Sequence, residues 1–576
     1  MLVTQVISAM TVTLCLLIDS IMIGRFLGVD PMTAYGLSNP LLLIFAALGT
    51  MISAGVQVMC GKSIGSGDRD GTDANYSASV VMALTIAAVG FIAVFFFTGP
   101  LATLLGAGHP GPDNVVFDLT VDYLKGFIVG APAFLCAQLM IPFLQLSGGR
   151  RRLVLAVIAM IVCDVAMDLL NVLVFHGGMF GMGLASSLSY YAAFLIGIGY
   201  FLRKDCLFRF RPKKVTAAIC GTMIHYGVPT VINQISVVLV VFLLNHVLLS
   251  VQGNTAVAAY SVISTIANIC YCFGSGCGAV ALMLSAIFYS DEDRRSLQKL
   301  VKVMTMYAAG LGAAVMVIVF LAAPVLVPLF LTGGTEAKGM AVLGTRLFTL
   351  SLIPSALNTT YKNYFQGVSH IRLAELLSFL QSFAMKALFA LSLSGVLGVT
   401  GVWLCHLGGE TVTLLILAAV VWHKCGAVRF TADAFSMLPA DFGAAPENCM
   451  EHSVRDLDSA IEVSRKAGEF CEAHGMDERK SFVISLAIEE MVANILKHGF
   501  TADNKKHNVD VRLITRAEGA VIRIRDNCEG FDPLHYLELH NADDAVSHLG
   551  IRMVMAMVTD AAYVNSLGLN NLTLKL

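Results

Sequence analysis

The segment GKSIGSGDRD, residues 61–70, is a short charged stretch between two apolar stretches that are each long enough to cross a membrane. Its Asp68–Arg69 pair recurs 225 residues later as Asp293–Arg294. The same shift, without a gap, aligns Gly28 with Gly253, Ala34 with Ala259, Tyr35 with Tyr260, Gly49 with Gly274, and Ala54 with Ala279. The sequence therefore predicts two related halves, an arrangement common in secondary transporters, which place the transport site between the halves.

The composition of the whole chain is that of a membrane protein. Of its 576 residues, 56% are hydrophobic and only 14% are charged, whereas soluble domains carry about a quarter charged residues. The net charge of −2 gives no basic excess, so we expect no nucleic-acid partner. Most of the 14 cysteines stand singly in apolar runs, which indicates buried thiols rather than disulfides or metal ligands.

Apolar stretches of about 20 residues or more, the length that spans a bilayer, recur along residues 1–423. We place them at 1–23, 38–60, 77–105, 121–146, 152–175, 181–201, 219–249, 255–288, 301–331, 342–368, 371–398 and 400–423. The predicted fold class is an all-α polytopic membrane domain of twelve helices in two six-helix bundles.

Basic residues gather in the even-numbered connections between these spans. Three arginines stand at 150–152 after the fourth span, and six basic residues stand between 203 and 214 after the sixth. Connections rich in Lys and Arg stay in the cytoplasm. We therefore expect a multi-pass protein of the cytoplasmic membrane, surrounded by the lipid bilayer, with both termini on the cytoplasmic side.

The composition changes after residue 423. Residues 424–450 contain Pro439, Gly443 and Pro446, which is typical of a linker. Residues 451–576 have the charge content of an ordinary globular protein and are long enough for one domain.

Ionisable side chains inside apolar spans need a reason, because each costs several kcal/mol unless it is paired or solvated. The candidates for a transport cavity or a coupling site are Asp19 in the first span, Asp164, Asp168 and Asn171 on one face of the fifth, Lys362 and Asn363 with Asn358 and Gln366 in the tenth, and Glu410 in the twelfth. The alternative is that these groups pair structurally or reach the membrane interface.

The segments IDSIMIGRFLGVDPMTAYGLSNP (18–40), GKSIGSGDRD (61–70) and DVAMDLLNVLVFHGGMFGMGLASSLSYY (164–191) resemble the multidrug and toxin extrusion (MATE) family, over residues 1–423. The resemblance implies a V-shaped pair of helix bundles that exports small organic compounds in exchange for Na⁺ or H⁺, with Asp19 at the family's coupling position. Some branches carry an acid early in the seventh span. The segment YGVPTVINQISVVLV (226–240) has none, so the coupling ion stays open.

In the tail, the segment LAIEEMVANILKHG (486–499) combines two patterns. Glu490, Asn494 and His498 are four residues apart, which on a helix places them on one face. The opposite face carries the apolar residues Ile488, Met491, Val492 and Ile495. Such a polar face is either a functional site or a solvated helix surface.

Three blocks of the tail, EEMVANILKHGF (489–500), RDNCEGFDP (525–533) and SHLGIRMVMAMVTDAAYV (547–564), resemble the GHKL ATPase superfamily, and within it the anti-sigma-factor serine kinases. The resemblance implies a two-layer α/β sandwich that binds ATP with Mg²⁺. Asn494 then ligates Mg²⁺, Glu490 acts as general base, and His498 contacts phosphate or metal-bound water.

The same resemblance assigns the nucleotide contacts of the two glycine boxes. Asp526 accepts from the adenine amino group, and Gly530 and Gly550 let the backbone approach the nucleotide. Gly550 also opens a helix whose N-terminus suits phosphate. Cys528 stands where the family usually has Gly. Serine-kinase or ATPase turnover therefore stays open beside a domain that keeps the fold and binds a partner.

The sequence favours a MATE-like exporter with a cytosolic ATP-binding regulatory domain. The alternative is a membrane signalling protein whose tail phosphorylates or binds an anti-anti-sigma-like protein. ATP-driven transport is disfavoured, because the chain has no GxxxxGK[ST] phosphate loop.

Overall fold

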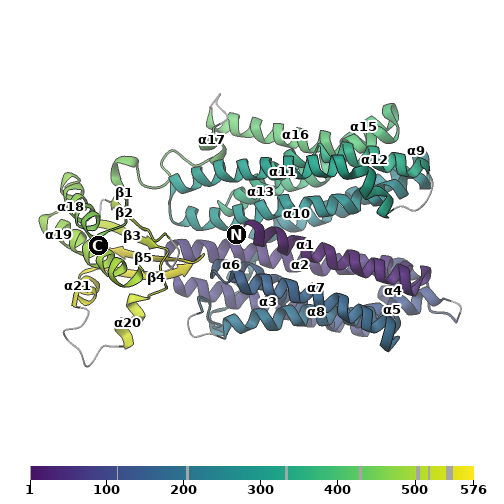
Figure 1. Cartoon of the computed structure of the whole chain (residues 1–576), viewed down its shortest axis with the longest axis horizontal. Helices are drawn as coiled ribbons and strands as arrows, with labels where there is room; N and C mark the ends of the chain where they lie inside the picture. Colours follow the sequence, from purple (N-terminus) through teal and green to yellow (C-terminus); the bar gives the residue numbers. More distant parts are fainter. Residues whose placement is uncertain are drawn as a thin grey trace.

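The structure is a computed structural model that describes residues 2–112, 114–202, 206–330, 335–426, 431–500, 506–516, 519–539 and 549–576. It has a long helical part and, at one end of it, a smaller part with a β-sheet (Figure 1).

The first eight α-helices lie together and form the N-terminal helix group (Figure 1). They are α1 (Leu2–Met22), α2 (Val29–Ser66), α3 (Arg69–Phe96), α4 (Thr98–Ala102), α5 (Val115–Ile128), α6 (Ala131–Leu146), α7 (Arg150–Leu170) and α8 (Gly178–Phe201). Their shared core is apolar and includes Phe45, Leu135 and Phe143.

The next eight helices form the C-terminal helix group, beside the first (Figure 1). They are α9 (Ala217–Gln252), α10 (Asn254–Ser290), α11 (Arg294–Phe330), α12 (Thr335–Thr349), α13 (Leu352–Gly367), α14 (Ile371–Phe379), α15 (Met385–Leu397) and α16 (Val399–Cys425). Their packing buries Trp403, Phe348 and Phe365.

Ten helices in the described part of the chain are long and apolar enough to cross a membrane, and the predicted twelve are reached only if each of two bent pairs is one span. The pairs are α5 with α6, bent by 50°, and α12 with α13, bent by 47°. Pro132 and Pro354 lie in the first turn of the second helix of each pair, where a proline is tolerated because the missing N–H has no helical acceptor.

Several helices are longer than the predicted spans. Helices α10 and α11 have 37 residues each, or about 55 Å at 1.5 Å per residue. A bilayer core is only about 30 Å thick. Each of these helices is therefore long enough to extend beyond the hydrocarbon region.

The C-terminal part begins after the short helix α17 (Ala432–Ser436). Its strands are β1 (Cys449–Val454), β2 (Val509–Arg516), β3 (Gly519–Asp526), β4 (Asp560–Ser566) and β5 (Leu569–Lys575), and its helices are α18 (Leu457–Ala473), α19 (Glu478–Asn494), α20 (Pro533–Leu539) and α21 (Leu549–Met557). The strands form one antiparallel sheet in the order β1-β2-β3-β5-β4.

Alternation along the strands gives this sheet two different faces. Ile522 and Ile524 of β3 are buried in a core with residues of α18, α19 and α21, as the pattern of AVIRIRD predicts. Arg523 and Arg525 point to the opposite face, which is turned toward the helical part of the chain (Figure 1).

Candidate functional sites

Three carboxyl groups meet inside the N-terminal helix group. Asp19 comes from α1, and Asp164 and Asp168 come from α7; their exposed fractions are 3%, 1% and 0%. Asp19 lies close enough to both other carboxyl groups for their charges to interact. The hydroxyl of Ser186 on α8 donates to Asp19 Oδ2 at 3.2 Å. The fold thus brings together the acids of two predicted spans.

Such a cluster cannot keep three negative charges. Burial disfavours the ionised form of each carboxyl group, and each charge disfavours the next. The part of the chain that the structure describes has no group of three or more His, Cys, Asp or Glu side chains placed to bind a metal ion.

Asn171 follows these acids along the helix but makes different contacts. Its Oδ1 accepts from the amide of Gly177 at 3.1 Å, and its Nδ2 donates to the carbonyl of Gly178 at 3.0 Å. Its side chain therefore holds the turn that leads into α8.

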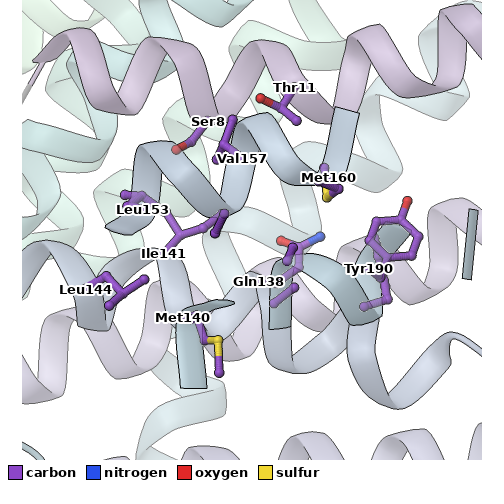
Figure 2. A pocket seen from close by; sticks show the side chains of 15 residues that line it. Ser8, Thr11, Gln138, Met140, Ile141, Leu144, Leu153, Val157, Met160 and Tyr190 are labelled. Atoms are coloured by element: carbon purple, nitrogen blue, oxygen red, sulfur yellow. The ribbon is translucent and has the colours of Figure 1, made fainter. Parts of the chain in front are cut away.

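A small apolar cavity lies between α1, α6, α7 and α8 (Figure 2). Its volume is about 50 Å³, and its lining includes Thr11, Met160 and Tyr190. Sites for drug-sized ligands measure roughly 300 Å³ or more. The N-terminal helix group must open before it can hold such a compound.

Lys362 and Asn363 lie in the other helix group. Lys362 Nζ donates to Asn233 Oδ1 of α9 at 2.6 Å, and Ser382 donates to the same oxygen at 2.7 Å. Asn363 Nδ2 donates to the Thr359 carbonyl of its own helix at 2.8 Å. These two predicted candidates are therefore separate from the carboxyl cluster.

The predicted candidate Glu410 has a partner that sequence reasoning missed. Lys386 Nζ lies 3.1 Å from Glu410 Oε1, and Asn358 Nδ2 donates to Glu410 Oε2 at 3.0 Å. Both charged side chains are buried. The signal was available, because Lys386 lies in the middle of the apolar span 371–398, whereas the other charged residues, Arg372 and Glu375, lie at its start.

In the C-terminal part, the predicted ladder is regular only as far as Asn494. Helix α19 ends there and continues as a π-helical turn, Ile495–Gly499. The wider turn of a π-helix changes the spacing of residues on one face, so His498 no longer stacks on Asn494 as predicted. His498 is exposed, and Glu490 and Asn494 remain one α-helical turn apart.

Glu490 lies against the start of α21. A Cβ atom built on Gly550 would be 2.0 Å from Glu490 Oε2. A larger residue at position 550 would therefore push this carboxylate away. The first turn of α21 thus packs directly against the polar face of α19.

Asp526 is held at the end of β3 by a buried network. Its Oδ1 accepts from Asn570 Nδ2 at 2.7 Å and from the amide of Cys528 at 2.9 Å. Asn570 Oδ1 accepts from the Tyr563 hydroxyl at 2.7 Å and from Asn565 Nδ2 at 2.6 Å. Burial raises the pKa of Tyr563 above its ordinary value, so this hydroxyl remains a donor.

Sequence reasoning missed the partners of Asp526, because strand register rather than spacing brings them together. Asp526 pairs with Asn570 across β3 and β5. Gly530 lies beside the same network, since a Cβ there would be 3.0 Å from Asn565 Nδ2. A Cβ on Gly499 would be 3.0 Å from Cys528 Cβ. The fold therefore joins the end of the π-helical turn to the first glycine box.

Comparison with known families gives two matches. Residues 5–170 and 229–392 match the MatE family, and residues 454–576 match the histidine kinase-like ATPase domain. The two MatE segments begin at residues 5 and 229. The distance between these starting points is 224 residues, close to the 225-residue shift between the two Asp-Arg pairs.

Relatives and solved structures agree with the first match. The chain is 22% identical to the probable multidrug resistance protein YoeA of Bacillus subtilis over 55% of this chain and 69% of that protein. It is also 22% identical to the multidrug export protein MepA of Staphylococcus aureus, over 68% of this chain and 85% of that protein.

Among solved structures, a MATE in complex with MaL6 superposes with a TM-score of 0.69 at 20% identity, over 76% of this chain and 96% of that one. An outward-facing multidrug resistance MATE transporter superposes with a TM-score of 0.67 at 20% identity, over 72% of this chain and 92% of that one. Since the family match covers more than half of the chain, this protein belongs to the MatE family and carries a C-terminal histidine kinase-like ATPase domain.

Proposed function

We propose that this protein exports small organic compounds in exchange for protons that bind at Asp19, Asp164 and Asp168. The observation that carries this proposal is the clustering of three buried carboxyl groups in one helix group. The names of its relatives, a multidrug export protein and a probable multidrug resistance protein, support an organic substrate.

The cluster suits an exchange mechanism because its charge depends on access to water. When the cluster faces the side with more protons, it is protonated and neutral enough to stay packed between α1 and α7. When it faces the other side, it loses protons and gains negative charge that favours water and a cationic substrate. Each ligand shifts the balance between the two states only by its differential affinity for them.

The end of the helical part that carries the ATPase domain is proposed to be cytoplasmic. Arg69 and Arg150, from the connections after the second and fourth predicted spans, both contact the ATPase domain. Basic connections stay in the cytoplasm, where ATP is available.

The ATPase domain is proposed to bind ATP with Mg²⁺ and to regulate transport. Asn494 supplies a hard oxygen for the ion, and Asp526 keeps Oδ2 for the adenine amino group while its Oδ1 is held by Asn570. Gly550 lies in the first turn of α21, and a helix N-terminus suits phosphate. Bound Mg²⁺ would neutralise phosphate charge. Glu490 is placed to accept a proton from an attacking hydroxyl or water.

Reconstitution into liposomes tests the export proposal. Uptake of an organic cation such as ethidium is followed under a pH gradient, a Na⁺ gradient or neither. We expect the pH gradient to drive accumulation and the Na⁺ gradient at equal pH to leave it near the level without a gradient. Accumulation driven by Na⁺ alone would replace protons by Na⁺ in the proposal, and equal uptake under all three conditions would refute coupled export.

A further inference from the structure

The face of the sheet that turns away from α18 and α19 has an unusual row of side chains. Strand register places one residue of each strand in this row: Glu451, Arg512, Arg523, Thr573 and Ala562. Arg512 and Arg523 stand directly opposite each other. Like charges in that position are unfavourable unless an opposite charge lies between them. We name this surface the outer sheet face.

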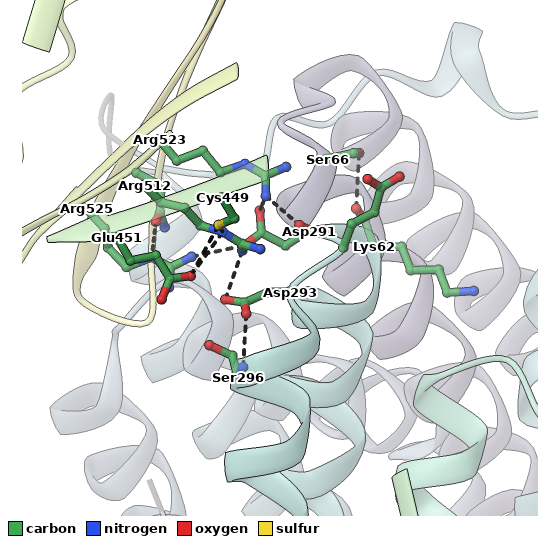
Figure 3. Close-up of polar contacts among 12 residues, drawn as sticks. Lys62, Ser66, Asp291, Asp293, Ser296, Cys449, Glu451, Arg512, Arg523 and Arg525 are labelled. Carbon is green, nitrogen blue, oxygen red and sulfur yellow. Dashed lines mark hydrogen bonds and ion pairs between the residues drawn. The ribbon is translucent and has the colours of Figure 1, made fainter. Parts of the chain in front are cut away.

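The turn between α10 and α11 supplies the opposite charge (Figure 3). Arg523 Nη1 lies 2.6 Å from Asp291 Oδ1, and Arg525 Nη2 lies 3.2 Å from Asp291 Oδ2. Arg512 Nη1 lies 3.2 Å from Asp293 Oδ2. Asp291 and Asp293 are 4% and 5% exposed. The contact therefore pairs two buried carboxylates with three arginines of the sheet.

The other edge of the sheet contacts the N-terminal helix group. In the turn between β4 and β5, the amide of Leu567 donates to the Leu146 carbonyl at 2.7 Å, and Arg150 Nη2 donates to the Leu567 carbonyl at 3.1 Å. Val564 is part of the apolar core of that helix group. A five-stranded sheet, roughly 19 Å from first to last strand, thus reaches from one helix group to the other.

The two repeat-related Asp-Arg turns are both engaged by the ATPase domain. Asp68 and Asp293 each cap the next helix, by accepting from the amides of Gly71 and Ser296 at 2.8 and 2.9 Å. In the first turn, Arg69 Nη1 reaches Asp532 Oδ2 of the ATPase domain at 3.3 Å. In the second turn, Asp293 binds an arginine. The domain therefore contacts equivalent turns of the two halves. It offers a carboxylate to the first turn and an arginine to the second.

The helix groups are packed closely where the ATPase domain binds. A Cβ on Gly65 of α2 would be 2.2 Å from the Ile287 carbonyl of α10, and one on Gly55 would be 2.2 Å from the Met223 carbonyl of α9. Lys62 Nζ also donates to the Tyr226 hydroxyl at 2.8 Å. Opening this end requires α2 to leave α9 and α10, so the turns after α2 and α10 must separate.

We propose that the ATPase domain is a clamp, in which the outer sheet face holds the ends of the two helix groups together and favours the state that is closed at this end. The proposal rests on the export function above, since it explains how an attached domain controls an alternating transporter. A sheet has a fixed width, so it fits both turns at one separation only. Opening breaks the contacts of one edge and leaves buried charges or backbone groups without partners.

Distance measurement tests the clamp without transport. Spin labels are attached at Arg151→Cys and Lys299→Cys, exposed positions in α7 and α11, in full-length protein in detergent. We expect one short distance in this parent protein. Arg523→Glu should shift the ratio of separated to closed molecules by roughly tenfold or more, because it places like charges in buried contact.

Two further variants make the result decisive. Arg69→Glu alters an exposed side chain at the opposite contact and should also raise the separated fraction, even if Arg523→Glu does not fold. Arg465→Glu breaks an exposed pair with Glu469 within α18, whose side chains are 63% and 59% exposed, and should change the ratio little. If neither Arg523→Glu nor Arg69→Glu exceeds Arg465→Glu, the clamp is refuted.

Transport measured in liposomes distinguishes failure of the clamp proposal from failure of the export proposal. Unchanged distances with normal gradient-driven uptake refute the clamp alone. Distances that change as expected, without uptake under any gradient, refute export alone and leave the domain as a clamp on another membrane function.

Discussion

Asp526 and Asn494 differ in how far neighbouring residues fix the orientation of their side chains. Asp526 is fixed by Asn570, Cys528 and the network behind them, so its free oxygen has a defined direction. Asn494 ends helix α19 just before the π-helical turn. Both residue types were chosen from the sequence, but only the structure shows how Asp526 is oriented.

Asp526→Asn should weaken ATP binding by roughly tenfold or more, because a hydrogen bond to a charged acceptor is replaced by one to a neutral amide. Asn494→Ala should weaken binding only when Mg²⁺ is present, since it removes an oxygen ligand. Calorimetry on the full-length protein in detergent measures both, and the exposed His498→Ala serves as control. If all variants bind ATP equally, the nucleotide site does not lie in residues 489–533.

Glu490→Ala should separate binding from turnover. A general base acts in the transition state, so ATP affinity should survive while any phosphoryl transfer falls by roughly a hundredfold. Release of phosphate and transfer to added serine-containing partner proteins are followed with labelled ATP. A wild-type protein that binds ATP without measurable turnover would identify the domain as a nucleotide sensor.

At the scale of elements, hydropathy predicted where the membrane helices lie but not how they bend or extend. The bends in α5–α6 and α12–α13 occur where a new helix starts, with Pro132 or Pro354 in its first turn. Hydropathy averaged over a window of residues does not detect such bends. Alternation in β3 predicted which face Ile522 and Ile524 share. It did not predict what covers Arg523 and Arg525, because the acidic turn that binds them is more than 200 residues away.

The buried pair between α15 and α16 gives a prediction at this scale. Lys386→Met leaves the Glu410 carboxylate without its cation, which should destabilise the protein by about 3–5 kcal/mol. The double variant Lys386→Met, Glu410→Gln should recover most of this loss, because Asn358 still has an acceptor. Thermal unfolding in detergent measures the difference. A single variant as stable as wild type would show that Glu410 does not need Lys386 as its partner.

For the whole molecule, the proposed function requires that the ATPase domain lie on the cytoplasmic side of the membrane. Cysteines introduced at Lys213 and Glu478, both exposed, should react with a membrane-impermeant maleimide only after cells are opened. A cysteine at His109, exposed in the connection at the opposite end, should react in intact cells, and the unmodified protein gives the background. Labelling of position 478 from outside would place the ATPase domain away from ATP and overturn its regulatory role.

The central claim is that the carboxyl cluster exchanges protons for an organic substrate. It is tested most directly by proton release from purified protein in weakly buffered detergent solution when ethidium is added. We predict release of roughly one proton per bound ethidium, as linkage between the two ligands requires, and none from Asp19→Asn, whereas the exposed control Asp30→Asn behaves as wild type. Ethidium binding without proton release in the wild-type protein, or equal release from Asp19→Asn, would contradict the account.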